Sequence, residues 1–152
     1  VSSHARRRAM RRNFEYANKE ALVGYKGERA QLYASLKLSG MDAAPLQIAV
    51  FADEETDQGH ALGRASMPET LMYSTVTAIR TMWLVARAEG IGIGWVSILE
   101  PSEVPKILDT LATWRFVAYL CIGFPEKESE SPALEDAGWE HRRPDSDFVI
   151  ER

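Results

Sequence analysis

The sequence has a single cysteine, and this scarcity excludes two kinds of site. Cys121 has no partner for an intrachain disulfide, and a metal cluster of several cysteines would lack ligands. Its apolar surroundings predict a small buried hydrophobic residue rather than a nucleophile. The histidines show no metal-ligand spacing, and His60 lies in a polar stretch that favours a surface position. Such sparing use of cysteine is typical of the reducing cytoplasm, where we expect the protein.

Nucleotide-binding loops and membrane segments are also missing. No phosphate-binding loop is present, and Gly90, Gly92 and Gly94 enter a predicted strand, whereas a dinucleotide fingerprint opens a helix. The most apolar stretch, residues 71–88, is interrupted by polar side chains and predicts a buried helix rather than a bilayer span. The net charge of −4 lacks the basic footprint of a nucleic-acid binder, and the arginines of residues 6–12 predict a solvated helix face. We therefore expect neither a nucleic-acid nor a membrane partner.

The composition predicts one globular domain over residues 1–152, since 45% of the residues are hydrophobic and 26% are charged. The chain opens at Val1 directly in a helical pattern, so we expect upstream sequence in the natural protein. An acidic, proline-containing extended C-terminal arm over residues 125–152 is expected to wrap a partner or a neighbouring subunit. Periodicity, glycine and proline predict helices over 3–22, 28–40, 66–90 and 101–108, strands over 46–51, 91–99 and 114–124, and a surface loop over 53–65. This order favours α/β or α+β with a sheet covered by helices.

Two elements carry most of the predicted core. In the helix over residues 66–90, Ser66 is the expected N-cap, Glu69 closes a capping box, and Gly90 ends the helix. This helix is apolar over most of its circumference, which one domain seldom surrounds, so we expect a second subunit against it. The strand over residues 114–124 is apolar on both faces and is expected at the centre of the sheet. Strict alternation would give one face to Phe116, Ala118, Leu120 and Ile122.

The segment from Gly94 to Leu99 is the most informative part of the sequence for function. A strand that ends in a polar residue and turns at Pro101 often lines a ligand crevice. Gly94 would let a flat ligand approach the backbone closely. Two structural alternatives remain open: Trp95 as a core residue, and Ser97 as a hydroxyl that satisfies a neighbouring backbone group. The pattern alone leaves the function open.

Several segments of the chain resemble the 5,6-dimethylbenzimidazole synthase family, often called BluB, of the nitroreductase superfamily. They are residues 33–38, 63–64, 67–69, 84–90 and 94–98, followed by Gly138-Trp139, Arg142 and Pro144. The resemblance implies an α+β, three-layer nitroreductase-like fold with a mixed or antiparallel central sheet, and a homodimer with FMN at the subunit interface. It also implies that reduced FMN, supplied by a flavin reductase, is consumed with dioxygen. The product implied is 5,6-dimethylbenzimidazole, the lower ligand of vitamin B12.

The resemblance also implies roles for individual residues. Ser97 matches the active-site serine near the flavin ring, where a hydroxyl would steer protons. Lys37 matches a lysine over the cofactor, in a segment from residue 24 to residue 41 that resembles the family's lid. Arg142 matches an arginine that holds the FMN phosphate, and Trp95 and Val96 are expected to give backbone and wall contacts. The structural alternatives are a surface lysine and a solvated arginine in the tail.

The chain departs from the family at its N-terminal end. The arginine-rich phosphate-binding motif, the catalytic aspartate, a second flavin-binding serine and a Gln-Pro-Trp segment have no counterpart in these 152 residues. Two alternatives to the synthase therefore stay open. One is an FMN-dependent NAD(P)H nitroreductase that leaves its flavin intact, and the other is a catalytically inert domain that acts only through its interface.

Overall fold

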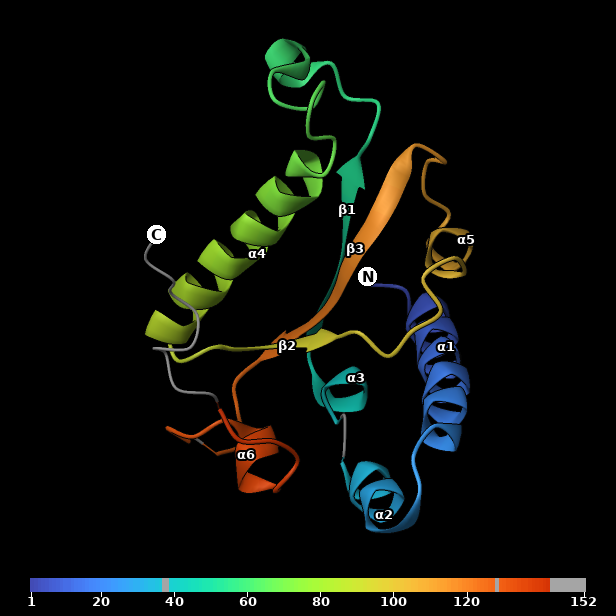
Figure 1. Ribbon diagram of the computed structural model, residues 1–152, viewed down its shortest axis with the longest axis vertical. Coiled ribbons are helices and arrows are strands. Elements are labelled where there is room, and N and C mark those ends of the chain that lie inside the picture. Colours follow the sequence, from blue (N-terminus) through green and yellow to red (C-terminus); the bar gives the residue numbers. More distant parts are fainter. Residues whose placement is uncertain (37–38, 128, 143–152) are drawn as a thin grey trace, which may run out of the picture.

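The computed structural model describes residues 1–36, 39–127 and 129–142 (Figure 1). Its strands are β1 (Leu46–Asp53), β2 (Gly92–Val96) and β3 (Trp114–Gly123). Its helices are α1 (His4–Val23), α2 (Gly27–Ser35), α3 (Gly40–Ala43), α4 (Thr70–Ala88), α5 (Val104–Leu108) and α6 (Ala133–Asp136), with a 3-10 turn η1 (Gln58–Ala61). The α+β class expected from the sequence is confirmed.

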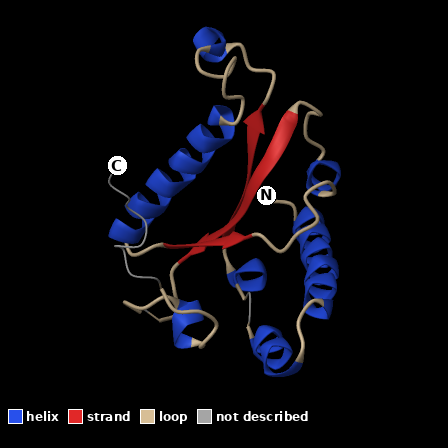
Figure 2. Ribbon diagram, viewed as in Figure 1, coloured by secondary structure: helices blue, strands red, loops and turns tan. Residues whose placement is uncertain are grey.

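The sheet of the described residues has three strands in the order β1-β3-β2, and both pairings are antiparallel. The predicted central position of β3 is confirmed, because Ala118, Tyr119 and Leu120 are fully buried between its neighbours. Figure 2 shows the sheet lying between helices on its two sides. With β3 paired on both sides, β1 and β2 lie at the edges of the described sheet.

Two apolar layers fill the space between the sheet and the helices. On one face α4 packs Ile79 against Ile93 of β2 and Leu120 of β3. On the other face Met10 of α1 packs in one cluster with Tyr119 of β3 and with residues of α5. Figure 1 shows α4 on one side of the sheet and α1, α3 and α5 on the other, so the three-layer arrangement is confirmed.

Strict alternation along β3 is wrong at its first half, because the strand contains a β-bulge. Val50 pairs with Ala118 and Phe51 pairs with Phe116, which leaves Val117 as an extra residue in the ladder. The bulge turns Phe116 to the face opposite the predicted one, where its ring lies 5.6 Å from that of Phe51.

The predicted capping box of α4 is also wrong. The helix begins at Thr70, and Glu69 takes the N-cap position without a side-chain hydrogen bond. Ser66 instead donates from its hydroxyl to the Gly63 carbonyl oxygen at 3.2 Å, because residues 63–69 fold into turns of their own. The predicted stop is confirmed: Gly90 follows the helix with a φ of +71°, a conformation that favours glycine.

Gly40 begins a helix rather than ending one, which corrects the predicted span of the second helix. The helix α2 stops at Ser35, and Gly40 opens α3. A Cβ added at Gly40 would lie 3.2 Å from the Cβ of Cys121. The close approach of α3 to β3 is therefore possible because Gly40 has no side chain. Cys121 is buried, as predicted, and burial raises the pKa of its thiol to about 11, which keeps it protonated and unreactive.

The N-terminal arginines are not simply a solvated helix face. Arg7 donates from Nε to the Val1 carbonyl at 2.7 Å and from Nη2 to the Pro45 carbonyl at 2.9 Å. Arg11 pairs with Asp42 of α3 at 3.0 Å. These two side chains therefore connect α1 to the segment that leads into β1 and stabilise the fold.

The outer face of α4 carries exposed apolar side chains among polar residues such as Ser74, Thr77 and Thr81. Tyr73, Val76, Leu84 and Val85 are 57%, 41%, 55% and 61% exposed, and Ile79 is the buried residue of this helix. The sheet therefore covers one side of the helix only. The expected second subunit against the other side stays a prediction.

Candidate functional site

A cavity of about 690 Å³ lies where β2 leaves the sheet. Its walls come from α1, from α2 and the residues flanking it, from the end of β2, and from α6 with the residue that follows. The lining residues are Asn18, Ala21, Tyr25, Tyr33, Ser35, Leu36, Trp95, Ser97, Ile98, Ala133, Leu134, Ala137 and Trp139. A mostly apolar lining with a few polar groups is typical of a small-molecule site.

The strand end that the sequence singled out forms one wall of this cavity. β2 stops at Val96, earlier than the predicted residue 99, because the chain leaves the sheet at Ser97 and turns there. Trp95 and Ser97 both line the cavity, as expected. An added Cβ at Gly94 would meet only the Cys121 carbonyl oxygen, at 3.8 Å, so the outer backbone of this edge strand is open to a flat ligand.

Val96 lies differently from its neighbours. Its side chain is 4% exposed and belongs to the core cluster on the α1 side of the sheet. Its side chain is therefore absent from the cavity lining, and a contact to FMN through its backbone stays a prediction. Alternation along the strand explains the difference, since successive side chains point to opposite faces.

A hydrogen-bonded pair that the sequence did not reveal supplies polar groups to the cavity. The Tyr33 hydroxyl donates to Oδ1 of Asn18 at 2.8 Å, joining α2 to α1. Burial, and secondarily the phenol of Tyr25, raises the pKa of Tyr33, so the hydroxyl stays a donor. With Oδ1 occupied, the Asn18 amide is oriented so that its NH₂ group remains available as a donor. A lone asparagine in a helix carries no local sequence signal for such a role.

An aromatic cluster closes the cavity beside α2. The rings of Tyr25 and Tyr33 stack at 4.8 Å, and the Trp139 ring lies 5.4 Å from Tyr25 and 6.0 Å from Tyr33. The Arg29 guanidinium sits 4.6 Å above the Trp139 ring, and the same side chain pairs with Glu140 at 3.8 Å. The described part of the predicted C-terminal arm therefore contains a helix, α6, and folds back onto its own chain.

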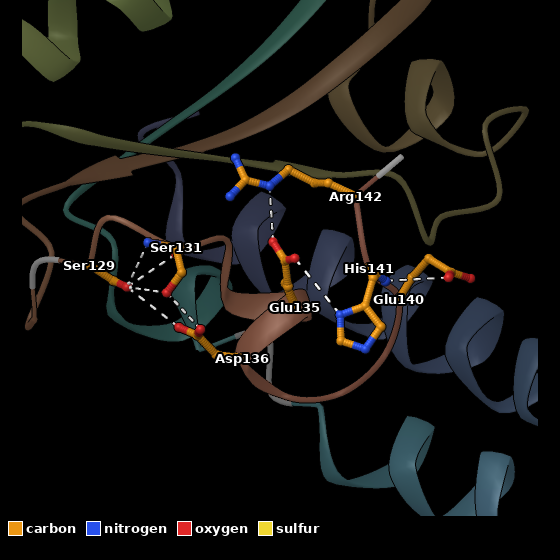
Figure 3. A network of polar contacts seen from close by, with 7 residues as sticks. All are labelled: Ser129, Ser131, Glu135, Asp136, Glu140, His141 and Arg142. Atoms are coloured by element: carbon orange, nitrogen blue, oxygen red, sulfur yellow. Dashed lines mark hydrogen bonds and ion pairs between the residues drawn. The ribbon is translucent and has the colours of Figure 1, made fainter. Parts of the chain in front are cut away.

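In the same C-terminal segment Arg142 reaches toward Glu135 of α6, as Figure 3 shows. Its Nε is 3.0 Å from Oε2 of Glu135, and Nδ1 of His141 lies 3.8 Å from the other carboxylate oxygen, Oε1. Arg142 is 71% exposed and is absent from the cavity lining. The structure thus brings Trp95 and Ser97 together but leaves Arg142 outside, and Lys37 falls outside the described residues.

The described part of the chain was also compared with the requirements of a metal site and of a membrane-spanning helix. No group of three or more histidine, cysteine or acidic side chains is placed to hold a metal ion. Among the described helices, none is long and apolar enough to cross a membrane. His60 is exposed, as predicted, and lies in the 3-10 turn η1.

Sequence comparisons find close relatives with a shared description. The chain matches the family model described as "Nitroreductase family" over residues 3–124. It is 54% identical over 144 residues to the 5,6-dimethylbenzimidazole synthase of Rhodospirillum rubrum, covering 95% of this chain and 68% of that protein. It is 50% identical over 144 residues to the 5,6-dimethylbenzimidazole synthase of Rhodobacter capsulatus, with coverages of 95% and 70%.

Structural comparisons find similar folds at low sequence identity. A crystal structure of oxidized iodotyrosine deiodinase bound to FMN and 3-iodo-L-tyrosine matches with a TM-score of 0.68 and 18% identity, covering 100% of this chain and 72% of that one. The crystal structure of a BluB-like flavoprotein from Clostridium difficile 630 matches with a TM-score of 0.63 and 17% identity, with coverages of 100% and 77%. At these identities the likeness concerns the fold alone.

Proposed function

The chain belongs to the nitroreductase family and, within it, groups with the 5,6-dimethylbenzimidazole synthases; from this premise we propose that it breaks down reduced FMN to 5,6-dimethylbenzimidazole. The sequence-based expectations of family and fold are thereby confirmed. The observation that carries the proposal is the position of Ser97, the serine expected in the active site, on the wall of the cavity at the end of β2.

The residues around the cavity fit FMN. Ligand sites of drug-sized molecules have volumes of about 300–1,000 Å³, and this cavity has about 690 Å³. The indole of Trp95 and the rings of Tyr25 and Trp139 offer flat apolar surface in the cavity. Gly94 precedes Trp95 and leaves open space beside the backbone, but it does not itself line the cavity. We propose that Trp95, Ser97 and Asn18 hold the ring system.

Each of these side chains has a definite chemical capacity. Reduced FMN, when bound, supplies the electrons and the carbon atoms of the product. The Ser97 hydroxyl both donates and accepts hydrogen bonds, so it can move a proton at the ring edge. The Asn18 amide donates to a carbonyl oxygen and is held in orientation by Tyr33. Residues of α2 and α6 line the same cavity, so they would shield a bound flavin from part of the solvent.

The same proposal assigns contacts with FMN to Arg142 and Lys37. Arg142 is proposed as the phosphate contact, which requires its guanidinium to leave Glu135. Because the Arg142 side chain is 71% exposed, the loss of this ion pair costs little, about 0–1 kcal/mol. Lys37 is proposed to lie over the flavin, as its place in the expected lid indicates.

We further propose dioxygen as co-substrate, a flavin reductase as electron donor, the cytoplasm as location and a homodimer as the working form. The exposed apolar side chains on α4 support the homodimer, since a second subunit would cover them. In this arrangement the outer side of α4 meets its equivalent in a second copy.

Aerobic incubation of the protein with reduced FMN tests the proposed function. We expect 5,6-dimethylbenzimidazole in the chromatogram and a matching loss of flavin. A flavin that is recovered whole, while NAD(P)H reduces an electron-poor acceptor, would favour the ordinary nitroreductase instead. Ser97→Ala is expected to fold normally and to lose most product formation, because its site is exposed and only a hydroxyl is removed.

A further inference from the structure

We propose that Asn13 is a positioning residue that holds the chain after β2 so that Ser97 faces the cavity. Asn13 lies on α1 and does not line this cavity, so it would act through the backbone of the segment that carries Ser97. The inference rests on the proposed function, because it gives Asn13 a role only if Ser97 takes part in the reaction.

The contact is a two-point clamp on one residue. Nδ2 of Asn13 donates to the Glu100 carbonyl oxygen at 3.1 Å, and Oδ1 accepts from the Glu100 backbone N–H at 2.8 Å. The two residues are 87 positions apart in the chain. Two parallel hydrogen bonds to a single peptide residue fix its orientation as well as its distance, which one bond would not do.

The surroundings indicate that the amide has a purpose other than packing. Asn13 is 8% exposed, and its neighbours Met10 and Phe14 on the same helix belong to the apolar core together with Leu99 and Val104. An apolar side chain of similar size would fill this position without the cost of desolvating an amide. The clamp offsets that cost by pairing both polar atoms of the amide, so it specifies one position of the backbone.

The clamp lies close enough to Ser97 to control it. β2 holds the chain at Val96 and Asn13 holds it at Glu100, so Ser97 lies in a short bridge fixed at both ends. Within the bridge the Leu99 N–H donates to the Ser97 carbonyl at 3.0 Å. Beyond it, the Glu100 side chain accepts from the Ser102 hydroxyl at 2.8 Å and leads into α5. Loss of the clamp would free the bridge at one end.

The first test compares Asn13→Ala with a control that removes another buried hydrogen bond. Tyr119→Phe is the control, because the Tyr119 hydroxyl lies in the same core cluster but donates to Gln47, at 2.6 Å, and not to Glu100. In Asn13→Ala we expect faster amide hydrogen exchange at Glu100 and a fall in turnover of about 10- to 100-fold, since a misplacement near 1 Å has effects of that order. Flavin affinity should stay within about threefold of the wild type. Tyr119→Phe should leave the Glu100 exchange and the turnover at wild-type values.

A double variant separates positioning from general destabilisation. If Asn13 acts through Ser97, Asn13→Ala should reduce turnover strongly in the wild type and hardly at all in Ser97→Ala. Equal losses in both backgrounds, or wild-type turnover in Asn13→Ala, would overturn the inference. So would unchanged exchange at Glu100. If the wild type forms no 5,6-dimethylbenzimidazole, the proposed function fails on its own account, and the Glu100 exchange still decides whether the clamp exists.

Discussion

The hydrogen bond between Tyr33 and Asn18 allows a quantitative test of how the cavity is organised. Tyr33→Phe removes the donor that lies 2.8 Å from Asn18 Oδ1 and keeps the ring that stacks on Tyr25 at 4.8 Å. A hydrogen bond of this kind contributes about 0.5–1.5 kcal/mol net to stability. Because Asn18 is half-buried and water can reach its freed oxygen, we expect a loss near the lower end of that range.

The same substitution should weaken flavin binding. Without Tyr33 as a donor, the Asn18 amide is free to rotate, and part of its interaction with a flavin carbonyl is lost. A cost below about 1.4 kcal/mol corresponds to a rise in Kd of up to tenfold, so we expect about a 2- to 10-fold rise. Urea unfolding measures the first effect, and quenching of flavin fluorescence during a titration measures the second.

Tyr25→Phe is the matched control. Its hydroxyl lies on the adjacent ring of the same cavity and makes no hydrogen bond within the described residues. We expect wild-type stability and wild-type Kd from this variant. If the two Tyr→Phe variants behave alike, or if Tyr33→Phe keeps the wild-type Kd, the orientation of Asn18 by Tyr33 has no part in binding.

Three further predictions concern the fold. Gly123→Ala places a Cβ 2.9 Å from Cδ of Pro45 and should cost about 1–3 kcal/mol in urea unfolding, whereas Gly24→Ala, with its nearest contact at 3.4 Å, should cost far less; equal costs would contradict the packing. Burial raises the pKa of Cys121 from 9.0 to about 11, so the folded state holds this proton more tightly and loses stability as pH rises between those values, by about 1 kcal/mol at pH 10. In Cys121→Ala the loss should shrink by about that amount, while the raised pKa of Tyr33 and of Tyr119 leaves a smaller loss of the same sign. A pH slope as steep as that of the wild type would contradict the assignment to Cys121. Leu84→Asp, on the outer face of α4, should shift the protein toward monomers in light scattering with little change in folding, and an unchanged mass would remove this face from the interface.

The sequence predicted the features that depend on local pattern. β3 was placed at the centre of the sheet because both of its faces are apolar, and the stop of α4 followed from Gly90. Ser97 was singled out because a strand ended in a polar residue before a proline turn, and the structure places it on the cavity wall. In each case the signal and its consequence lie within a few residues of each other.

The features that sequence reasoning missed depend on partners far away in the chain. The bulge at Val117 arises from the pairing of β3 with β1, so the sequence pattern of β3 alone does not predict it. Asn13 forms its hydrogen bonds with Glu100, and Asn18 is oriented by its hydrogen bond with Tyr33. Ser66 was assigned to the cap of α4 because its spacing to Glu69 matched, but a nearer carbonyl at Gly63 takes its hydroxyl.

A crystal structure of the protein with bound FMN tests the central claim most directly. The account predicts the three-ring system in the cavity beside the end of β2, with an edge atom of the ring about 3 Å from the Ser97 hydroxyl oxygen. A flavin bound elsewhere on the protein, with Ser97 facing solvent or an empty cavity, would contradict it.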